Sequence, residues 1–221
     1  YMDIKNQHKD KILFFRLGDF YEMFFDDALL ASKELEITLT GRDCGMEERA
    51  PMCGIPYHSA DTYIARLIDK NYKVAICEQV EDPALAKGIV RREVIRVITP
   101  GTVIDSAMLD EKNNNYLLSL YGDEKYVALS YIDLSTGEFF CTGIDASELG
   151  TLRNEIGRIN PAEVIVNDTA ASDKALGSFL TAQYPSYTTL DKKYFETDGC
   201  TRRLKRQFNL SALEGYGLRN E

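Results

Sequence analysis

Residues 12–25, with the sequence ILFFRLGDFYEMFF, decide the fold of the first half of the chain. The continuous apolar run that begins at Ile12 predicts a buried β-strand, which ends at Gly18. From Tyr21 onward, large apolar residues recur at helical spacing, and this period predicts an amphipathic helix over residues 21–36. A buried strand followed at once by a helix is typical of the α/β class.

The corner between this strand and this helix has two interpretations. Asp19 and Glu22 stand three residues apart before a hydrophobic run, which is the pattern of a capping box, and the neighbouring aromatic rings then belong to the core. Helical geometry, however, places Phe20 off the buried face, and a large apolar ring at an exposed corner needs a partner. Residues i and i+2 face each other in an extended segment but not on a helix, so Phe20 and Glu22 act on one ligand only if Phe20 lies before the helix and Glu22 in its first turn, both projecting from the same edge.

The other elements of the first half follow from proline, glycine and apolar patterns. Residues 50–58 hold two prolines and a glycine, which exclude a regular helix and predict a turn. The further predictions are a helical or frayed segment over 1–9, a strand over 37–40, a loop over 41–48, a helix capped by Ser59 or Asp61, a strand over 74–77, a helix or turn opened by Asp82, and a strand over 89–98. The polar run 105–115 separates a first domain, residues 1–108, from a second domain, residues 109–221.

The second half opens with strands and continues with alternating elements. Strands are predicted over 116–121, 126–134 and 138–144, with the alternation of half-buried antiparallel strands. Helices over 146–159, 172–181 and 199–208 then alternate with strands over 164–166 and 186–190. This order resembles a ribonuclease-H-like layout. The expected fold class is therefore α/β, with an α+β mixed-sheet domain followed by a ribonuclease-H-like α/β domain.

Composition excludes several classes of protein. The 221 residues carry 26 basic and 35 acidic side chains, a net charge of −9, which excludes coverage of DNA by bulk positive charge alone. The five cysteines have neither metal-ligand nor disulfide-framework spacing, so we expect reduced thiols and a cytoplasmic location. No apolar run approaches the roughly 18 residues of a membrane span, and no signal peptide opens the chain. The chain begins with Tyr1 rather than Met, and we expect it to be a piece of a longer protein.

Two clusters of basic residues interrupt this acidic background. One comprises Lys87, Arg91, Arg92 and Arg96, and the other comprises Arg202, Arg203, Lys205 and Arg206. Runs of this kind are commonly the solvated face of a helix or strand. The first cluster also offers phosphate contacts along a predicted strand.

Residues 15–24, FRLGDFYEMF, closely resemble the N-terminal signature of the MutS family of bacterial DNA mismatch repair proteins. Three further stretches agree with that family in order and spacing, namely PMCGIPYH at 51–58, VAICEQ at 74–79 and VITPGT at 97–102. The resemblance spans the whole chain and is most specific over residues 1–105. It implies a mismatch-recognition domain, MutS domain I, followed by a connector domain, MutS domain II.

The resemblance also implies a site. In this family a Phe-X-Glu motif reads the mismatch, and Phe20 and Glu22 match it. Phe20 is then an aromatic wedge beside the lesion, and Glu22 contacts the base. Around them we expect DNA contacts from Leu17, Asp19, Tyr57, His58, Arg91, Arg92 and Arg96.

Partners and cofactors follow from the same resemblance. It implies mismatched duplex DNA as the ligand, MutL as a partner of the connector domain, and a homodimeric full-length protein that binds ATP and Mg²⁺ elsewhere. The chain contains no G-x-x-x-x-G-K-[ST] phosphate loop, so we expect these residues to bind no cofactor and to have no enzymatic activity. The fragment itself is expected to be a monomer that binds DNA weakly.

Two other functions compete with this interpretation. Asp133, Glu138 and Asp168 are carboxylates in the ribonuclease-H-like half, and a two-metal nuclease needs several such groups to converge. A structural adaptor that makes no DNA contact is the third class, and only the family resemblance excludes it.

Overall fold

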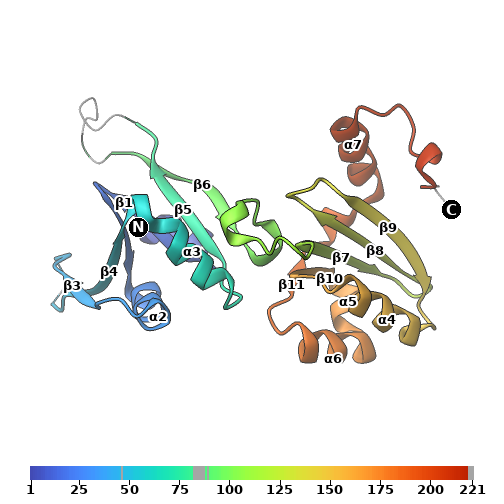
Figure 1. Ribbon diagram of the computed structural model, residues 1–221, viewed down its shortest axis with the longest axis horizontal. Helices are drawn as coiled ribbons and strands as arrows, with labels where there is room; N and C mark the ends of the chain where they lie inside the picture. The colour runs from blue at the N-terminus through green and yellow to red at the C-terminus, as the bar shows by residue number, and fades with distance from the viewer. Residues whose placement is uncertain (46, 82–87, 89, 219–221) are drawn as a thin grey trace. The chain divides into compact units, whose positions relative to one another are not determined.

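The computed structural model describes residues 1–45, 47–81, 88 and 90–218 (Figure 1). The chain divides into two compact units, Tyr1–Asn113 and Asn114–Glu221. The division falls inside the polar run 105–115. Each unit is built on one sheet that mixes parallel and antiparallel pairs, which confirms the α/β fold class. None of the described helices is long and apolar enough to cross a membrane.

Unit 1 is a six-stranded sheet with the strand order β3-β4-β2-β1-β5-β6. Its strands are β1 (Ile12–Leu17), β2 (Phe20–Phe24), β3 (Thr40–Arg42), β4 (Ala50–Pro56), β5 (Val74–Gln79) and β6 (Arg92–Ile98). Its helices are α1 (Met2–Gln7), α2 (Phe25–Leu35) and α3 (Ala60–Ile68). Among the described strands of unit 1, β1 and β5 form the one parallel pair, and α2 and α3 lie between them in the chain.

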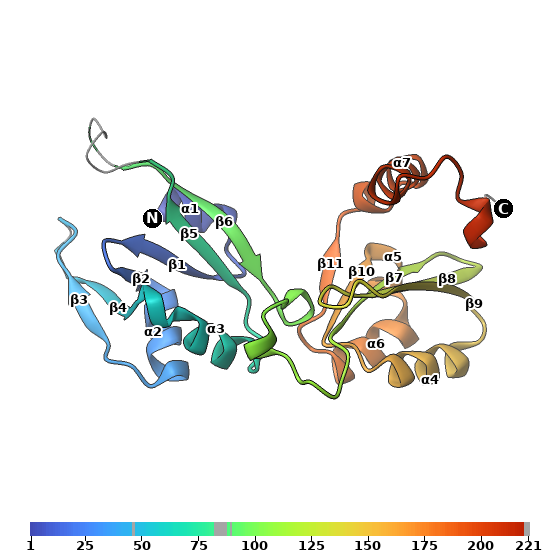
Figure 2. The same cartoon turned by 45° about the horizontal axis from the view of Figure 1, so that its top comes forward.

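The two faces of this sheet are covered differently (Figure 2). On one face, Phe14, Tyr21, Met23 and Ile55 pack against α2 and α3 and form the larger core. On the other face, a smaller cluster around Leu13, Phe15, Ala75 and Cys77 packs against residues of the α1 segment. Successive side chains along a strand point to opposite faces of the sheet, so each strand contributes residues to both faces.

Asp27 ties the α1 segment to the sheet. Its buried carboxylate accepts hydrogen bonds from the Tyr1 hydroxyl at 2.7 Å and from the backbone amide of Leu13 at 3.0 Å. The same carboxylate pairs with the Lys5 ammonium at 2.7 Å. The Lys5 charge and the two hydrogen bonds therefore stabilise the ionised carboxylate of Asp27, which burial alone would destabilise.

The helix predicted over 21–36 is wrong in its first turn. Residues Phe20–Phe24 form β2, and α2 begins only at Phe25. Gly18, with a φ of +58°, lies in the tight turn that leads β1 back antiparallel into β2. Aromatic residues suit strands as well as helices, and pairing of β2 with the distant β4 decides between the two periods.

Three smaller predictions also need correction. The short strand expected over 37–40 lies later, at Thr40–Arg42. The expected turn at 50–58 is mostly β4, whose prolines sit at positions compatible with pairing, and only Tyr57–Ser59 form a 3₁₀ turn. The strand expected over 89–98 begins at Arg92. The expectations for Asp82 and Lys87 fall outside the described residues.

Unit 2 is a five-stranded sheet with the order β11-β10-β7-β8-β9. Its strands are β7 (Tyr116–Gly122), β8 (Tyr126–Asp133), β9 (Phe139–Asp145), β10 (Glu163–Asn167) and β11 (Thr188–Leu190). Its helices are α4 (Leu149–Ile159), α5 (Asp168–Ser172), α6 (Lys174–Gln183) and α7 (Thr197–Phe208). Three antiparallel strands are followed by two parallel ones, which is the layout that the sequence predicts.

Candidate nucleic-acid interface

Phe20 and Glu22 lie two residues apart on β2 and therefore project from the same face of the sheet. The ring of Phe20 is 45% exposed, whereas Tyr21 and Met23 between and beyond them are buried in the core. The capping-box interpretation of Asp19 and Glu22 is wrong, because no helix begins there. The extended alternative places an apolar ring and a carboxylate side by side at the surface.

Glu22 is held by an ion pair that the sequence did not reveal. Its Oε2 accepts a hydrogen bond from Nη1 of Arg42, which lies on the edge strand β3. Directly opposite Glu22 on β4 is Gly54, where an added Cβ would lie 3.4 Å from the Glu22 Cγ. Glu22 thus lies against a backbone that carries no side chain, and Arg42 reaches it past the Phe24 ring, whose centroid is 6.0 Å from the guanidinium carbon.

Leu17 is the last residue of β1, and Asp19 lies in the turn that follows it. Leu17 is half-buried, pairs with Phe20 across the hairpin and packs on the smaller hydrophobic cluster. Asp19 is exposed, and its carbonyl accepts a hydrogen bond from the Tyr57 backbone amide at 3.0 Å. The turn that precedes Phe20 is therefore tied to the segment after β4.

A second network supports this turn from the helical side of the sheet. The Arg16 guanidinium carbon lies 3.5 Å from the centroid of the Tyr57 ring, and Arg16 pairs with Glu78 at 3.3 Å. The Tyr21 hydroxyl donates to the same carboxylate. Burial, together with this bond and the Glu78 charge, raises the pKa of Tyr21, so its hydroxyl stays a donor. Aromatic, cationic and acidic groups from β1, β2 and β5 therefore support the β1–β2 hairpin, which carries Phe20.

Tyr57 and His58 are both exposed and lie in the 3₁₀ turn after β4. Their rings meet edge to face, with centroids 5.7 Å apart. Phe20 pairs with Pro56 across the sheet, and Pro56 immediately precedes Tyr57 and His58 in the chain.

The three predicted arginines of the β6 region differ in their surroundings. Arg91 and Arg96 are exposed, and Arg91 pairs with Glu93 at 2.8 Å. Arg92 is half-buried: its Nε donates to the Arg16 carbonyl at 2.8 Å, and its guanidinium lies 5.2 Å from the Phe15 ring. Strand β6 is three strand spacings from β2, or roughly 14 Å. Arg92 therefore supports the hairpin, and the other two face solvent.

Asp133 and Glu138 of unit 2 already accept hydrogen bonds from neighbouring donors. Asp133 accepts hydrogen bonds from the Ser135 hydroxyl at 2.6 Å and from the amides of Ser135, Thr136 and Asn115. Burial opposes ionisation, but these donors outweigh it and lower the pKa of Asp133. Glu138 accepts from Asn114 at 2.6 Å. Within the described residues, no group of three or more His, Cys, Asp or Glu is arranged to hold a metal ion.

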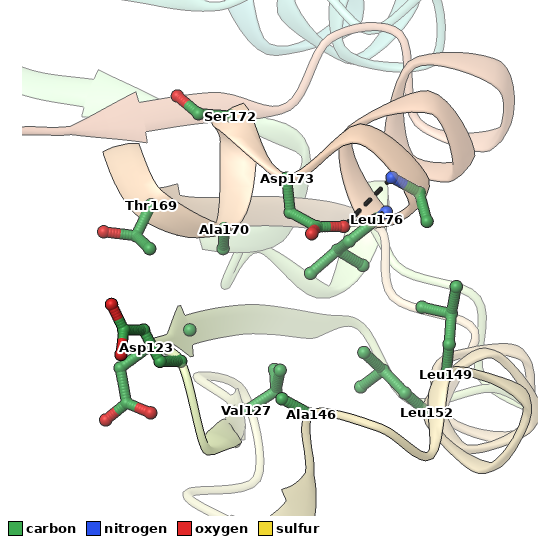
Figure 3. A pocket seen from close by; sticks show the side chains of 13 residues that line it. Asp123, Val127, Ala146, Leu149, Leu152, Thr169, Ala170, Ser172, Asp173 and Leu176 are labelled. Atoms are coloured by element: carbon green, nitrogen blue, oxygen red, sulfur yellow. Dashed lines mark hydrogen bonds between the residues drawn. The ribbon is translucent and has the colours of Figure 1, made fainter.

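One hollow of unit 2 is an apolar groove of about 430 Å³ (Figure 3). Val127, Leu149, Leu152 and Leu176 line it, and Asp123 lies at its rim. Asp173 beside it caps α6 by accepting from the amides of Ala175 and Leu176. Asp123 accepts hydrogen bonds from the amides of Lys125 and Tyr126, so both aspartates bind backbone amides at a turn or a helix start.

The comparisons with known proteins agree with both units. Residues 1–107 match the family model of MutS domain I, and residues 115–221 match that of MutS domain II. The chain belongs to the MutS family. Its sequence is 55% identical to the DNA mismatch repair protein MutS of Acetivibrio thermocellus over 97% of this chain, and 56% identical to that of Ruminiclostridium cellulolyticum over 96%.

The chain spans about a quarter of the length of these MutS relatives, namely 25% of each. MutS of Clostridioides difficile is 62% identical over 76% of this chain and 17% of its own length. Among solved structures, Pelota of Archaeoglobus fulgidus is 14% identical, with a TM-score of 0.33 over 87% of this chain and 64% of that chain, which is too slight a likeness to support an argument. The family assignment therefore rests on sequence.

Proposed function

We propose that this chain detects mismatched or unpaired bases in duplex DNA by inserting the Phe20 ring beside the lesion. The observation that carries the proposal is the exposed Phe20 ring on the same open face as Glu22, at the end of a hairpin that Arg16, Tyr57 and Glu78 hold in place. A wedge must be rigid, because a mobile ring would lose in ordering entropy what stacking gains. The names of the MutS relatives support this function.

The wedge senses how easily a base step opens. Unstacking one base step costs a few kcal/mol, and this cost is lowest where pairing is already defective. Stacking of an aromatic ring on a freed base returns about 1–3 kcal/mol. Because these contributions nearly cancel, the sign of the sum depends on the stability of the base pair before insertion. Phe20 therefore reports deformability rather than base identity, and one ring serves many mismatches.

Glu22 supplies the second part of the discrimination. A carboxylate near DNA is repelled by phosphates, so it disfavours binding wherever it finds no partner. At a displaced base, Glu22 contacts a hydrogen-bonding edge of that base, which in matched DNA is occupied by the paired base. Glu22 thus weakens binding to matched duplex more than binding to a lesion.

The remaining candidate residues hold the DNA backbone. Tyr57 and His58 are exposed next to Pro56, the partner of Phe20 in the sheet. Arg96 on the far edge strand β6 and Arg91 just before that strand are exposed, and they offer phosphate contacts about three strand spacings from the wedge. Leu17, Asp19 and Arg92 position the hairpin through the contacts described above.

Unit 2 is proposed to act as the connector of the full-length protein and to relay DNA binding to MutL. The full-length protein is proposed to be a cytoplasmic homodimer that binds ATP and Mg²⁺ outside these two units, whereas the fragment is a monomer that needs no cofactor. The rival nuclease function is disfavoured by Asp133, whose carboxylate is held by four donors of its own loop region. A nuclease would need that carboxylate to face a metal ion.

The proposal is tested by Phe20→Ala in the full-length protein, with Phe140→Ala as a control of similar exposure, 46%, in unit 2. Affinities for a duplex with one G·T mismatch and for the matched duplex are measured by fluorescence anisotropy. Phe20→Ala should weaken mismatched binding by about tenfold or more, the equivalent of one stacked base, and matched binding by less than about threefold.

Phe140→Ala should leave the ratio of the two affinities unchanged. Equal losses on both duplexes for Phe20→Ala would refute the wedge, and no loss on either would favour the structural adaptor.

A further inference from the structure

Arg42 is the feature of the open face that the proposed function does not use. It belongs to the three-residue edge strand β3, and its side chain is 45% exposed while pairing with Glu22, whose side chain is 17% exposed. The pair stands next to Phe20, since Phe20 and Glu22 share one strand face. A charge partner of the discriminating carboxylate therefore lies within reach of the same ligand.

The fold gives this pair room to form and to break. Gly54 leaves open the surface against which Glu22 lies, and β3, which carries Arg42, is an edge strand that pairs with β4 in the described sheet. Arg42 pairs with Ala50 on β4, whereas Glu22 pairs with Gly54, so the two side chains are not directly opposite each other. Arg42 reaches Glu22 along the sheet face, over the Phe24 ring. A long side chain on an edge strand can swing away without disturbing the core.

The exposure of the guanidinium makes a second partner available to it. A guanidinium binds a phosphate in the same two-pronged geometry as it binds a carboxylate. Solvent-exposed ion pairs are weak, so a DNA phosphate that comes close competes with Glu22 on nearly equal terms. Once Arg42 turns to a phosphate, the Glu22 carboxylate is free beside the wedge.

We propose that Arg42 is a specificity-determining residue that pairs with Glu22 in the free protein and on matched DNA, and moves to a phosphate when the wedge enters a lesion. This inference rests on the proposed function. On stiff matched duplex the backbone does not approach Arg42, so the pair persists and Glu22 gains no contact with a base. At a lesion the duplex bends toward the protein. The phosphate takes the guanidinium, and Glu22 is released to the base.

A double-mutant cycle in the full-length protein tests this exchange. The variants are Arg42→Gln, Glu22→Gln and their combination, measured on the G·T duplex and on matched duplex. If the ion pair must break when the protein binds the mismatch, the parent bears the free-energy cost of breaking it. A variant that lacks either Arg42 or Glu22 does not bear this cost. Arg42→Gln should then weaken mismatched binding about three- to fivefold more in the Glu22→Gln background than in the parent, as expected for an exposed pair. On matched duplex the two losses should be equal.

Salt dependence gives an independent readout. A phosphate contact contributes about 0.9 to the slope of log affinity against log salt. Arg42→Gln should therefore lower the slope by about one for mismatched duplex and leave it unchanged for matched duplex. Lys70→Gln is the matched control, because it removes one charge from an ion pair with Glu34 at the ends of α3 and α2, and it should change neither slope.

Two outcomes overturn the exchange. Equal losses from Arg42→Gln in both backgrounds on mismatched duplex would show that the pair stays intact. A loss that disappears in the Glu22→Gln background would show that DNA strengthens the pair instead of breaking it. Failure of the wedge is recognised separately, because Phe20→Ala would then lower both affinities equally whatever the cycle shows.

Discussion

Glu22 lies within strand β2 of unit 1 and Asp133 ends strand β8 of unit 2, and the partners of these two carboxylates differ in kind. Among the described residues, Glu22 has one hydrogen-bond partner, the side chain of Arg42, which is itself half exposed. Asp133 is 1% exposed and is bound by backbone amides and a hydroxyl of its own turn and of the segment before β7. A carboxylate whose partner can leave is available to a ligand, whereas one whose partners are backbone amides serves the fold.

The largest effect expected from this difference concerns the stability of unit 2. Asp133→Ala leaves the amides of Asn115, Ser135 and Thr136 without their acceptor and should lower the free energy of unfolding by about 3 kcal/mol. Hydrogen exchange in urea, followed on peptides from β7 to β9, measures unit 2 separately from unit 1.

Protection of unit 1 peptides should not change in this variant, which makes them the internal control. A loss below about 1 kcal/mol would mean that water replaces the carboxylate, and Asp133 would then again be a candidate for a ligand.

A smaller effect is expected in the pH dependence of unit 2. The pKa of Asp133 is lowered in the folded chain, so its contribution is present above the ordinary carboxyl value of about 3.9 and is lost as the pH falls through the lower folded value. Stability of unit 2 should therefore decrease between about pH 5 and pH 2 in the parent chain, and decrease less in Asp133→Asn, which cannot ionise.

The measurement is urea unfolding at several pH values, read from the same unit 2 peptides. Parallel pH profiles for the parent and for Asp133→Asn would show that the carboxylate is not bound more tightly when ionised, contrary to the hydrogen bonds in the structure.

The sequence predicted unit 2 more completely than unit 1, and the reason is the range of the deciding contacts. In unit 2, β7, β8 and β9 are neighbours both in the chain and in the sheet, so alternation and turn residues suffice. In unit 1, β2 lies between β1 and β4, and pairing with β4 makes Phe20–Phe24 a strand although its apolar spacing also fits a helix. Contacts between distant segments override local period.

The same reason explains which site residues were found. Phe20 and Glu22 stand in one short motif, so a local pattern identifies them, although their roles stay predictions. Arg42 was missed because its link to Glu22 depends on β3 and β4 pairing around the segment 43–49. The one signal in the sequence is Gly54, a glycine inside a strand, which indicates that another group lies close to the backbone.

The smallest effect completes the comparison. Glu22→Gln removes the charge of a partly exposed ion pair and should change the stability of unit 1 by less than about 1 kcal/mol, since such pairs contribute little. Hydrogen exchange on peptides from β2 and β4 gives the value, and the buried Asp27→Asn, which disturbs the bonds to Tyr1 and Leu13, is the control that should lower it clearly. If Glu22→Gln instead destabilised unit 1 as much as Asp27→Asn, Glu22 would be a structural carboxylate like Asp133. The contrast between Glu22, whose partner can leave, and Asp133, whose partners are part of the fold, would then fail. A ligand cannot bind a carboxylate that the folded protein cannot release.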